Sequence, residues 1–279
     1  MRWHGLAGAL LVLTLAGCSA SDAAIARPAA AGSTAGTAAS SSPAPSPVPS
    51  PAVDAAPSGP LAAVPAPVVV LDPGHNGGNA AHPEVVNAPV PDGAGGTKPC
   101  NTTGTATDAG FPEHAFTWDV ALRARDRLSA AGVTVVLTRE DDAGVGPCVD
   151  ERGQLAGRVG AAAFVSVHGD GAAADGRGFH VITSSLDPAG PQVAAGSAAL
   201  ATAVRDAMTA VEPVSSYVGS DGLDSRPDLA GLNLNAVPAV YVECGNMRNA
   251  ADAALMSAPE GRDAIADRLT AGVLAFLGR

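Results

Sequence analysis

The sequence is poor in positive charge and in aromatic residues. Its 279 residues include 16 Lys+Arg against 27 Asp+Glu, a formal net charge of −11, and Lys98 is the only lysine. A charge of this sign argues against proteins that bind nucleic acid or anionic membranes through basic patches, so we expect no nucleic-acid partner. Aromatic residues make up 3% of the chain and hydrophobic residues 47%, which predicts a core built from Ala, Val and Leu.

The apolar run at the N-terminus is too short to cross a bilayer as a helix. It follows Arg2, has about a dozen residues, which is the length of a signal-peptide core, and ends in Leu-Ala-Gly-Cys at 15–18. This ending resembles the lipobox of bacterial lipoproteins, in which the signal is cut before an acylated cysteine. We therefore expect residues 1–17 to be a lipoprotein signal peptide, Cys18 to be lipidated, and this lipid to be the only membrane anchor. The alternative is an ordinary secretory signal and a secreted protein.

Residues 18–66 consist almost entirely of Ala, Ser, Pro and Gly. Such a composition cannot bury enough apolar surface to offset the entropy lost on ordering, so this segment is predicted to be a disordered tether. Residues 67–279 remain, a length that suits one domain. We expect an exported protein whose single domain is held at the outer face of the cell membrane.

Short apolar runs alternate with amphipathic segments throughout residues 67–279, which predicts an α/β domain with a mostly parallel central sheet and helices on both faces. The strands are predicted at 68–71, 133–138, 163–167, 178–184 and 238–242. The helices are predicted at 113–131, 150–162, 194–211, 250–256 and 262–277. Residues 79–110, rich in Gly, Pro, Asn and Thr, are predicted to form a long loop or hairpin insertion.

Three polar residues follow predicted strands, where parallel sheets place their chemistry. His75 and His168, both flanked by glycine, follow the first and third strands, and Glu243 follows the apolar strand 238–242. Burial at this point would raise the pKa of Glu243, as a general base requires, unless the residue forms an ion pair with Arg248. Glu113 begins the first long helix, where the helix dipole alone would also favour a carboxylate.

Two imidazoles and one carboxylate form a zinc-binding set that leaves a fourth coordination position open for water. Metal hydrolases need a further glutamate, outside the ligand set, to take a proton from that water. The residue types therefore point to a metal hydrolase, and leave open which glutamate is the ligand.

Four motifs taken in order resemble the zinc-dependent N-acetylmuramoyl-L-alanine amidases of the amidase type 3 family, over about residues 67–278. They are DPGHNGG at 72–78, Glu113, SVHGDG at 166–171 and PAVYVECGNMRN at 238–249. The resemblance implies a single domain with a sheet of about six strands. It also implies Zn²⁺ bound by His75, Glu113 and His168, with Glu243 as catalytic acid and base. Asn76 departs from the family motif, which has glycine after the histidine.

The implied reaction is hydrolysis of the amide between the lactyl group of N-acetylmuramic acid and L-Ala of the stem peptide. We therefore expect peptidoglycan or a muropeptide as substrate, and a monomeric enzyme. Two alternatives are a non-catalytic peptidoglycan-binding module, which predicts loss of a ligand or of the base, and a zinc peptidase that cuts within the stem peptide.

Other polar residues receive provisional roles. Arg226, Asp228 and Asn233, in a predicted polar loop before the last strand, are assigned to contacts with the stem peptide. His114 adjoins Glu113 and could replace it as a ligand, whereas His82 and His180 are expected at the surface or in packing.

Cysteine placement predicts one disulfide. Cys100 and Cys148 both lie in loop-like segments of a chain expected to be exported, so we predict that they pair; the alternative is two free thiols. Cys244 lies in an apolar strand and is predicted to be a buried thiol.

Overall fold

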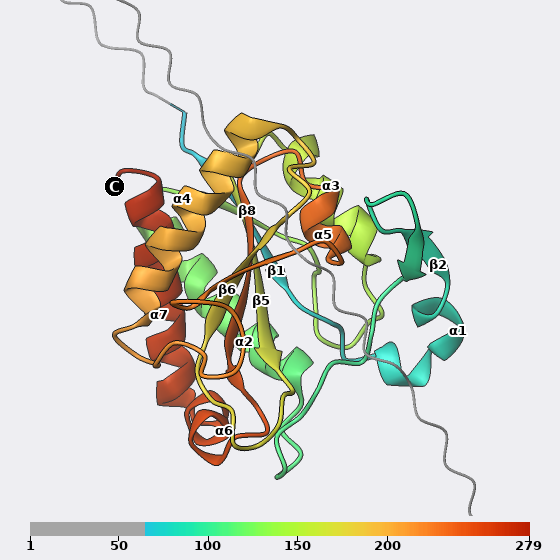
Figure 1. Cartoon of the computed structure of the whole chain (residues 1–279), viewed down its shortest axis with the longest axis vertical. Coiled ribbons are helices and arrows are strands. Elements are labelled where there is room, and N and C mark those ends of the chain that lie inside the picture. The colour runs from blue at the N-terminus through green and yellow to red at the C-terminus, as the bar shows by residue number, and fades with distance from the viewer. Residues whose placement is uncertain (1–64) are drawn as a thin grey trace, which may run out of the picture. The chain divides into compact units, whose positions relative to one another are not determined.

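Six strands form the central sheet in the order β4-β1-β5-β8-β6-β7 (Figure 1). Their bounds are β1 Val68–Pro73, β4 Thr134–Leu137, β5 Ala163–Asp170, β6 His180–Ser184, β7 Leu223–Arg226 and β8 Ala239–Asn246. Strands β4, β1, β5 and β8 are parallel, whereas β6 runs antiparallel to β8 and parallel to β7. The predicted α/β architecture with a mostly parallel sheet of about six strands is confirmed.

This computed structural model describes residues 65–279. The predicted signal peptide at 1–17, the lipidation site Cys18 and all but the last two residues of the predicted tether at 18–66 lie outside the described residues. No helix within 65–279 is long and apolar enough to cross a membrane.

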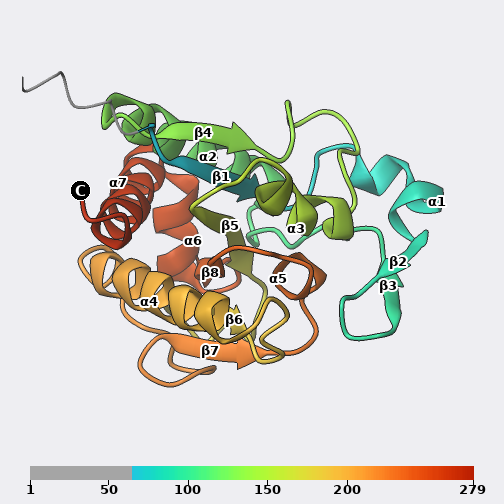
Figure 2. The same ribbon diagram turned by 90° about the horizontal axis from the view of Figure 1, so that it is seen from above.

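Helices cover both faces of the sheet (Figure 2). One face packs against α2 (Glu113–Ala130), α4 (Pro191–Met208), α6 (Ala250–Ser257) and α7 (Pro259–Phe276), and the other against α3 (Val149–Arg158) and α5 (Ala230–Asn233). Val69 and Leu71 of β1 pack with Phe116 on the first face, and Val70 packs with Ala156 on the second. Burial of both faces explains why the central strands read as continuous apolar runs.

Helix α2 follows its predicted pattern. Phe116, Val120, Ala124 and Leu128 recur every fourth residue and are all buried against the sheet. The helix ends at Ala130, shortly before Gly132, whose φ of 79° is a conformation that glycine adopts without a steric penalty. The buried stripe therefore fixes where Glu113, the first residue of the helix, meets the sheet.

Two predicted strand ends are wrong. Strands β5 and β8 continue to Asp170 and Asn246, so His168 and Glu243 lie within strands instead of after them. The pairing of the two strands runs through His168 opposite Glu243, with an irregularity before Asp170. A polar side chain does not end a strand whose backbone groups still find partners in the sheet.

Other boundaries also differ from the predictions. The helix predicted at 194–211 is α4, which begins with Pro191 as its first residue, a position that suits proline because the missing N–H has no partner there. Strand β7 and helix α5 were not predicted, because each has four residues and too little sequence to show a period. Arg226 accordingly ends a strand and does not lie in a loop.

The insertion predicted at 79–110 contains a hairpin of β2 (Pro89–Pro91) and β3 (Thr97–Pro99), preceded by the 3₁₀ turn η1 (Asn79–Ala81) and the short helix α1 (Pro83–Val86). Cys100, just after β3, forms a disulfide with Cys148 at the start of α3, with their Cα atoms 4.5 Å apart. The predicted pairing is confirmed, and Cys244 is a buried free thiol as predicted. The bridge ties the insertion to the body of the domain.

Reduction of this disulfide should loosen the insertion more than the sheet. In the chain-entropy model a crosslink across 48 residues destabilises the unfolded state by about 4 kcal/mol. We expect the reduced protein to melt at a lower temperature, and reduction to speed solvent exchange of the backbone amides in the insertion at 79–110 much more than of those in β1 and β5. Hydrogen exchange with mass spectrometry measures this, and a uniform rise in exchange across both regions would contradict it.

Candidate metal and catalytic site

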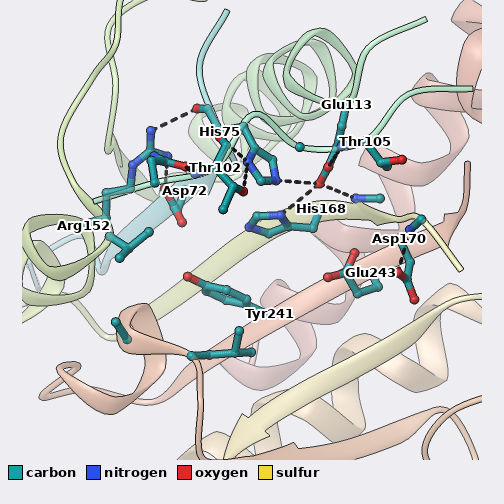
Figure 3. Close-up of a pocket in the computed structure, with 18 of the residues that line it drawn as sticks. Asp72, His75, Thr102, Thr105, Glu113, Arg152, His168, Asp170, Tyr241 and Glu243 are labelled. Carbon is teal, nitrogen blue, oxygen red and sulfur yellow. Dashed lines mark hydrogen bonds and ion pairs between the residues drawn. The ribbon is translucent and has the colours of Figure 1, made fainter. Parts of the chain in front are cut away.

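Two histidines and one glutamate converge at the carboxyl end of the sheet (Figure 3). His75 Nε2 lies 3.1 Å from Glu113 Oε1, and His168 Nδ1 lies 3.0 Å from the same oxygen. One ligand atom from each residue lies within 4.8 Å of the other two. The structure thus brings together the three predicted metal ligands, which come from the end of β1, the start of α2 and the strand β5.

The turn after β1 places His75 in an uncommon backbone conformation. Its φ is 62°, a region that residues other than glycine rarely adopt. The preceding residue has to be glycine, because a Cβ on Gly74 would lie 2.3 Å from Cε1 of His168. The turn therefore allows both imidazoles to approach one point.

Glu113 is held from both sides. It is 3% exposed; its Oε2 accepts a hydrogen bond from the backbone N–H of Thr105 at 2.9 Å, and its Oε1 accepts one from Gly169 at 3.1 Å. Burial alone would raise its pKa, but the adjacent imidazoles of His75 and His168 hold that pKa well below its ordinary value. Glu113 is consequently a carboxylate with a fixed orientation.

The donor set suits a zinc ion. His75 Nδ1 faces the carbonyl oxygen of Thr102 at 3.1 Å, and because a carbonyl only accepts, Nδ1 carries a proton and Nε2 is the nitrogen that could bind a metal. Tetrahedral zinc with bonds of about 2.0–2.2 Å needs ligand atoms about 3.3–3.6 Å apart. The observed separations from Glu113 Oε1, 3.1 and 3.0 Å, are close to that range.

Glu243 lies beside this set without being part of it. On β8 it pairs in register with His168 of β5, and its Oε2 is buried with no hydrogen-bond partner among residues 65–279. Burial, followed by the carboxylates of Glu113 and Asp170, raises the pKa of Glu243 well above its ordinary value. The alternative ion pair is not formed, because Arg248 Nη2 binds Asp108 Oδ1 at 2.7 Å. Glu243 has the properties of a general base.

The four residues open into a cleft of about 390 Å³. Tyr241 lies on its floor and stacks on His168, with ring centroids 4.9 Å apart and an interplanar angle of 27°. Lys98 and Arg226 also line this cleft. Neither Lys98 nor Tyr241 has a role predicted from the sequence, in which the one signal for Lys98 is that it is the only lysine.

The residues predicted to contact substrate separate into two groups. Arg226 lines the cleft and forms a two-pronged ion pair with Asp228, with Nε–Oδ1 at 2.9 Å and Nη2–Oδ2 at 2.7 Å. Asn233 is 3% exposed, and its amide nitrogen donates to the carbonyl oxygens of Asp92 and Pro227. Asn233 thus fastens the hairpin to the body and does not line the cleft, which differs from the substrate contact predicted for it.

The other histidines do not join the metal-ligand set. His114 points away, with Nδ1 2.8 Å from the carboxylate of Asp142, so the alternative in which it replaces Glu113 is not realised. His82 pairs with Glu84 at the surface. His180 is buried in packing, as one of the two predicted environments, but it lies opposite Glu243 in the pairing of β6 with β8, which the sequence did not indicate.

Comparison with known proteins agrees with this geometry. The model of the family described as N-acetylmuramoyl-L-alanine amidase matches residues 69–275. The N-acetylmuramoyl-L-alanine amidase Rv3717 of Mycobacterium tuberculosis is 48% identical over 211 residues, which cover 75% of this chain and 86% of that protein.

The chain is also similar to solved structures of amidases. The N-acetylmuramyl-L-alanine amidase Ami1 of Mycobacterium smegmatis is 47% identical, with a TM-score of 0.74 over 78% of this chain and 99% of that one. The apo form of Ami1 from Mycobacterium abscessus is 45% identical, with a TM-score of 0.73 over 77% and 100% of the two chains.

The site predicts opposite effects of pH on the metal-free and zinc-loaded proteins. Burial would lower the pKa of His75, but the Glu113 carboxylate outweighs burial and raises it. A raised pKa stabilises the fold below the unfolded value of about 6.5, and this contribution is lost as the pH rises through the folded value. Glu113, whose pKa is lowered, stabilises the fold above its ordinary pKa of 4.5 and stays charged throughout this range.

We therefore expect the melting temperature of the metal-free protein to fall between about pH 6 and pH 9, and that of the protein with zinc added to rise, since a zinc ion at this site would displace the His75 proton. Thermal unfolding with and without a chelator measures both. His75→Ala should abolish the difference and His82→Ala, at an exposed pair, should keep it. Equal pH trends for the two forms would contradict the assignment.

Proposed function

This chain belongs to the family of N-acetylmuramoyl-L-alanine amidases, and on that basis we propose that residues 67–279 form a zinc-dependent peptidoglycan hydrolase. The bond cut is the amide between the lactyl group of N-acetylmuramic acid and L-Ala of the stem peptide. The observation that carries the proposal is the convergence of His75 and His168 on one oxygen of Glu113, with an unpartnered Glu243 in the same cleft.

His75 Nε2, His168 Nδ1 and a carboxylate oxygen of Glu113 would hold the zinc ion. When bound, the ion supplies Lewis-acid polarisation of the amide carbonyl and lowers the pKa of a coordinated water toward about 7. Glu243 accepts the proton of the attacking water and delivers it to the departing alanine nitrogen. Its raised pKa suits both tasks, because the same carboxyl group must first gain and then release a proton near neutral pH.

The two alternatives raised by the sequence fare differently. A non-catalytic module would lack a ligand or the base, whereas this chain keeps all four groups, which favours an enzyme. A zinc peptidase that cuts within the stem peptide would use the same four groups. The peptidase and the amidase would therefore differ only in the amide bond that is cut, and the reaction products distinguish the two.

We further propose that Arg226 and Asp228 contact the stem peptide, together with Lys98. Lys98 Nζ donates to the carbonyl oxygen of Asp228 at 2.8 Å, so the two cations stand together at the wall of the cleft. Lys98 and Arg226 are positively charged groups in a cleft that also contains the carboxyl groups of Glu113 and Glu243. This wall suits the carboxylate groups of a peptide, and guanidinium and ammonium groups are the side chains that bind carboxylates directly.

Replacing the base tests the mechanism. In Glu243→Gln the shape of the side chain is kept and the proton acceptor is removed. Because the ligands are untouched, we expect zinc content to stay at one ion per protein and amide hydrolysis to fall by roughly 10²–10⁴-fold. Turnover on purified muropeptides and metal analysis of the same sample measure these quantities.

Glu212→Gln is the matched control. Glu212 is 4% exposed, pairs with Arg177 and has a pKa raised by burial to about 7, yet it does not line the cleft. We expect this variant to lose some stability and to keep its turnover. Near-normal turnover of Glu243→Gln, or an equal loss in both variants, would remove Glu243 from the mechanism.

Export and lipid anchoring remain a proposal that rests on the N-terminal sequence. Cleavage before Cys18 and attachment of two or more acyl chains would give durable membrane attachment where one chain is marginal. We expect the protein with its own sequence in the membrane fraction and the Cys18→Ser variant in the soluble fraction, with equal amounts of both proteins made. Cell fractionation, with an antibody against the domain, measures this. If the protein with its own sequence is found in the medium, the secreted alternative is favoured.

A further inference from the structure

A buried ion pair lies beside the two histidines. Asp72, in β1, and Arg152, in α3, are 1% and 2% exposed, and Arg152 Nη1 lies 2.8 Å from Asp72 Oδ1 (Figure 3). Burying two charges costs several kcal/mol of desolvation, and apolar residues of similar volume often stabilise a fold as well or better. Stability of the fold alone therefore does not explain why a charged pair is buried at this place.

Asp72 reaches His168 through one hydroxyl group. Ser166 Oγ donates to Asp72 Oδ2 at 2.6 Å, and His168 Nε2 lies 3.1 Å from the same Oγ. A carboxylate only accepts, and a serine hydroxyl has one proton. With that proton given to Asp72, Ser166 can only accept from His168, so Nε2 of His168 carries the ring proton.

The consequence is that Nδ1 of His168, 3.0 Å from Oε1 of Glu113, is the nitrogen left to bind a metal ion. His75 has the opposite tautomer, because the carbonyl oxygen of Thr102 accepts from its Nδ1 and leaves Nε2 free. The two histidines thus offer different nitrogens to the same point. Stacking of His168 on Tyr241 fixes the plane of the ring but cannot select which nitrogen is protonated.

Arg152 reaches the turn that carries His75. Its Nη1 donates to the carbonyl oxygen of Pro73 at 2.8 Å, and its Nη2 donates to the carbonyl oxygen of His75 and to Asn76 Oδ1, both at 3.0 Å. These bonds hold the residue whose φ is 62°. A backbone conformation of this kind persists only where the surroundings fix it.

We propose that the Asp72–Arg152 pair is a shared positioning device for both histidine ligands. Asp72 acts through Ser166 to set the tautomer of His168, so that this residue binds metal through Nδ1, and Arg152 fixes the turn that aims His75 Nε2. The inference rests on the proposed zinc site and assigns roles to three residues, Asp72, Ser166 and Arg152, none of which touches the metal. Groups that hydrogen bond to the ligands typically change metal affinity 10–100-fold when removed.

Two hydroxyl groups bound to Asp72 give a matched test. Ser166→Ala removes the link to His168, whereas Thr138→Val removes the bond from Thr138 Oγ1 to Asp72 Oδ1 and leaves the link intact. Both are buried, so both variants should lose thermal stability. We expect Ser166→Ala to bind zinc roughly 10–100-fold more weakly, measured by competition with a chromophoric chelator, and Thr138→Val to bind like the unmodified protein. Equal losses of affinity in the two variants would overturn the proposal.

Nitrogen NMR of the unmodified, zinc-loaded protein tests the tautomers even if Ser166→Ala fails to fold. We expect a proton on Nε2 and metal on Nδ1 for His168, and the reverse for His75. Metal on Nε2 of His168 overturns the relay. If the unmodified protein binds no zinc, the proposed function itself fails, whereas zinc binding with the wrong nitrogen refutes this inference alone.

Arg152→Lys tests the second arm. Lysine keeps the charge opposite Asp72 but lacks the fork that also reaches the carbonyl oxygens of Pro73 and His75 and the side chain of Asn76. We expect weaker zinc binding and a changed His75 spectrum, with the His168 nitrogens assigned as in the unmodified protein. An unchanged zinc affinity would remove Arg152 from the proposal.

Discussion

One carboxylate oxygen, Oε1 of Glu113, organises this end of the molecule. Two imidazole nitrogens and the backbone N–H of Gly169 all lie within 3.1 Å of it, and they come from segments far apart in the chain. The lone pairs of two imidazole nitrogens and a carboxylate oxygen repel one another at these distances, so protons or a cation must lie between them. The neighbouring strands β1 and β5, and the start of α2 above them, bring the three side chains together, so the core packing of the sheet is also what builds the site.

The insertion takes part in this arrangement. Thr102 orients His75 through its carbonyl oxygen, and Thr105 holds Glu113 through its backbone N–H; both residues follow Cys100, whose disulfide fixes the insertion to α3. On the other side, Lys98 and Asn233 connect the hairpin to the segment around Asp228. The segment that reads as an irregular loop in the sequence thus holds His75 and Glu113 in place and forms one wall of the cleft.

The sequence predicted the architecture, and the four residues that it singled out, His75, Glu113, His168 and Glu243, line one cleft. Apolar runs and the four-residue period of α2 predicted the sheet and its covering, because burial on both faces leaves that pattern. The resemblance to a family assigned Glu113 and Glu243 to different roles, which residue types alone left open. The sequence placed His168 and Glu243 after strands, and it assigned Asn233 to substrate, because neither backbone pairing nor burial can be read from local composition. Asp72 and Ser166 begin two of the motifs, but their contacts, like that of Thr102, join distant segments and cannot be read from local sequence.

The identity of the bond cut is the central claim, and one measurement addresses it directly. A purified N-acetylmuramic acid pentapeptide is hydrolysed in water enriched in the heavy oxygen isotope, and the products are analysed by mass spectrometry. We predict an intact peptide with a free L-Ala amine and a muramic acid product that carries the heavy oxygen in its lactyl carboxylate. A shortened peptide still attached to muramic acid, with the label at a peptide carboxyl group, would contradict the account and identify the protein as a peptidase.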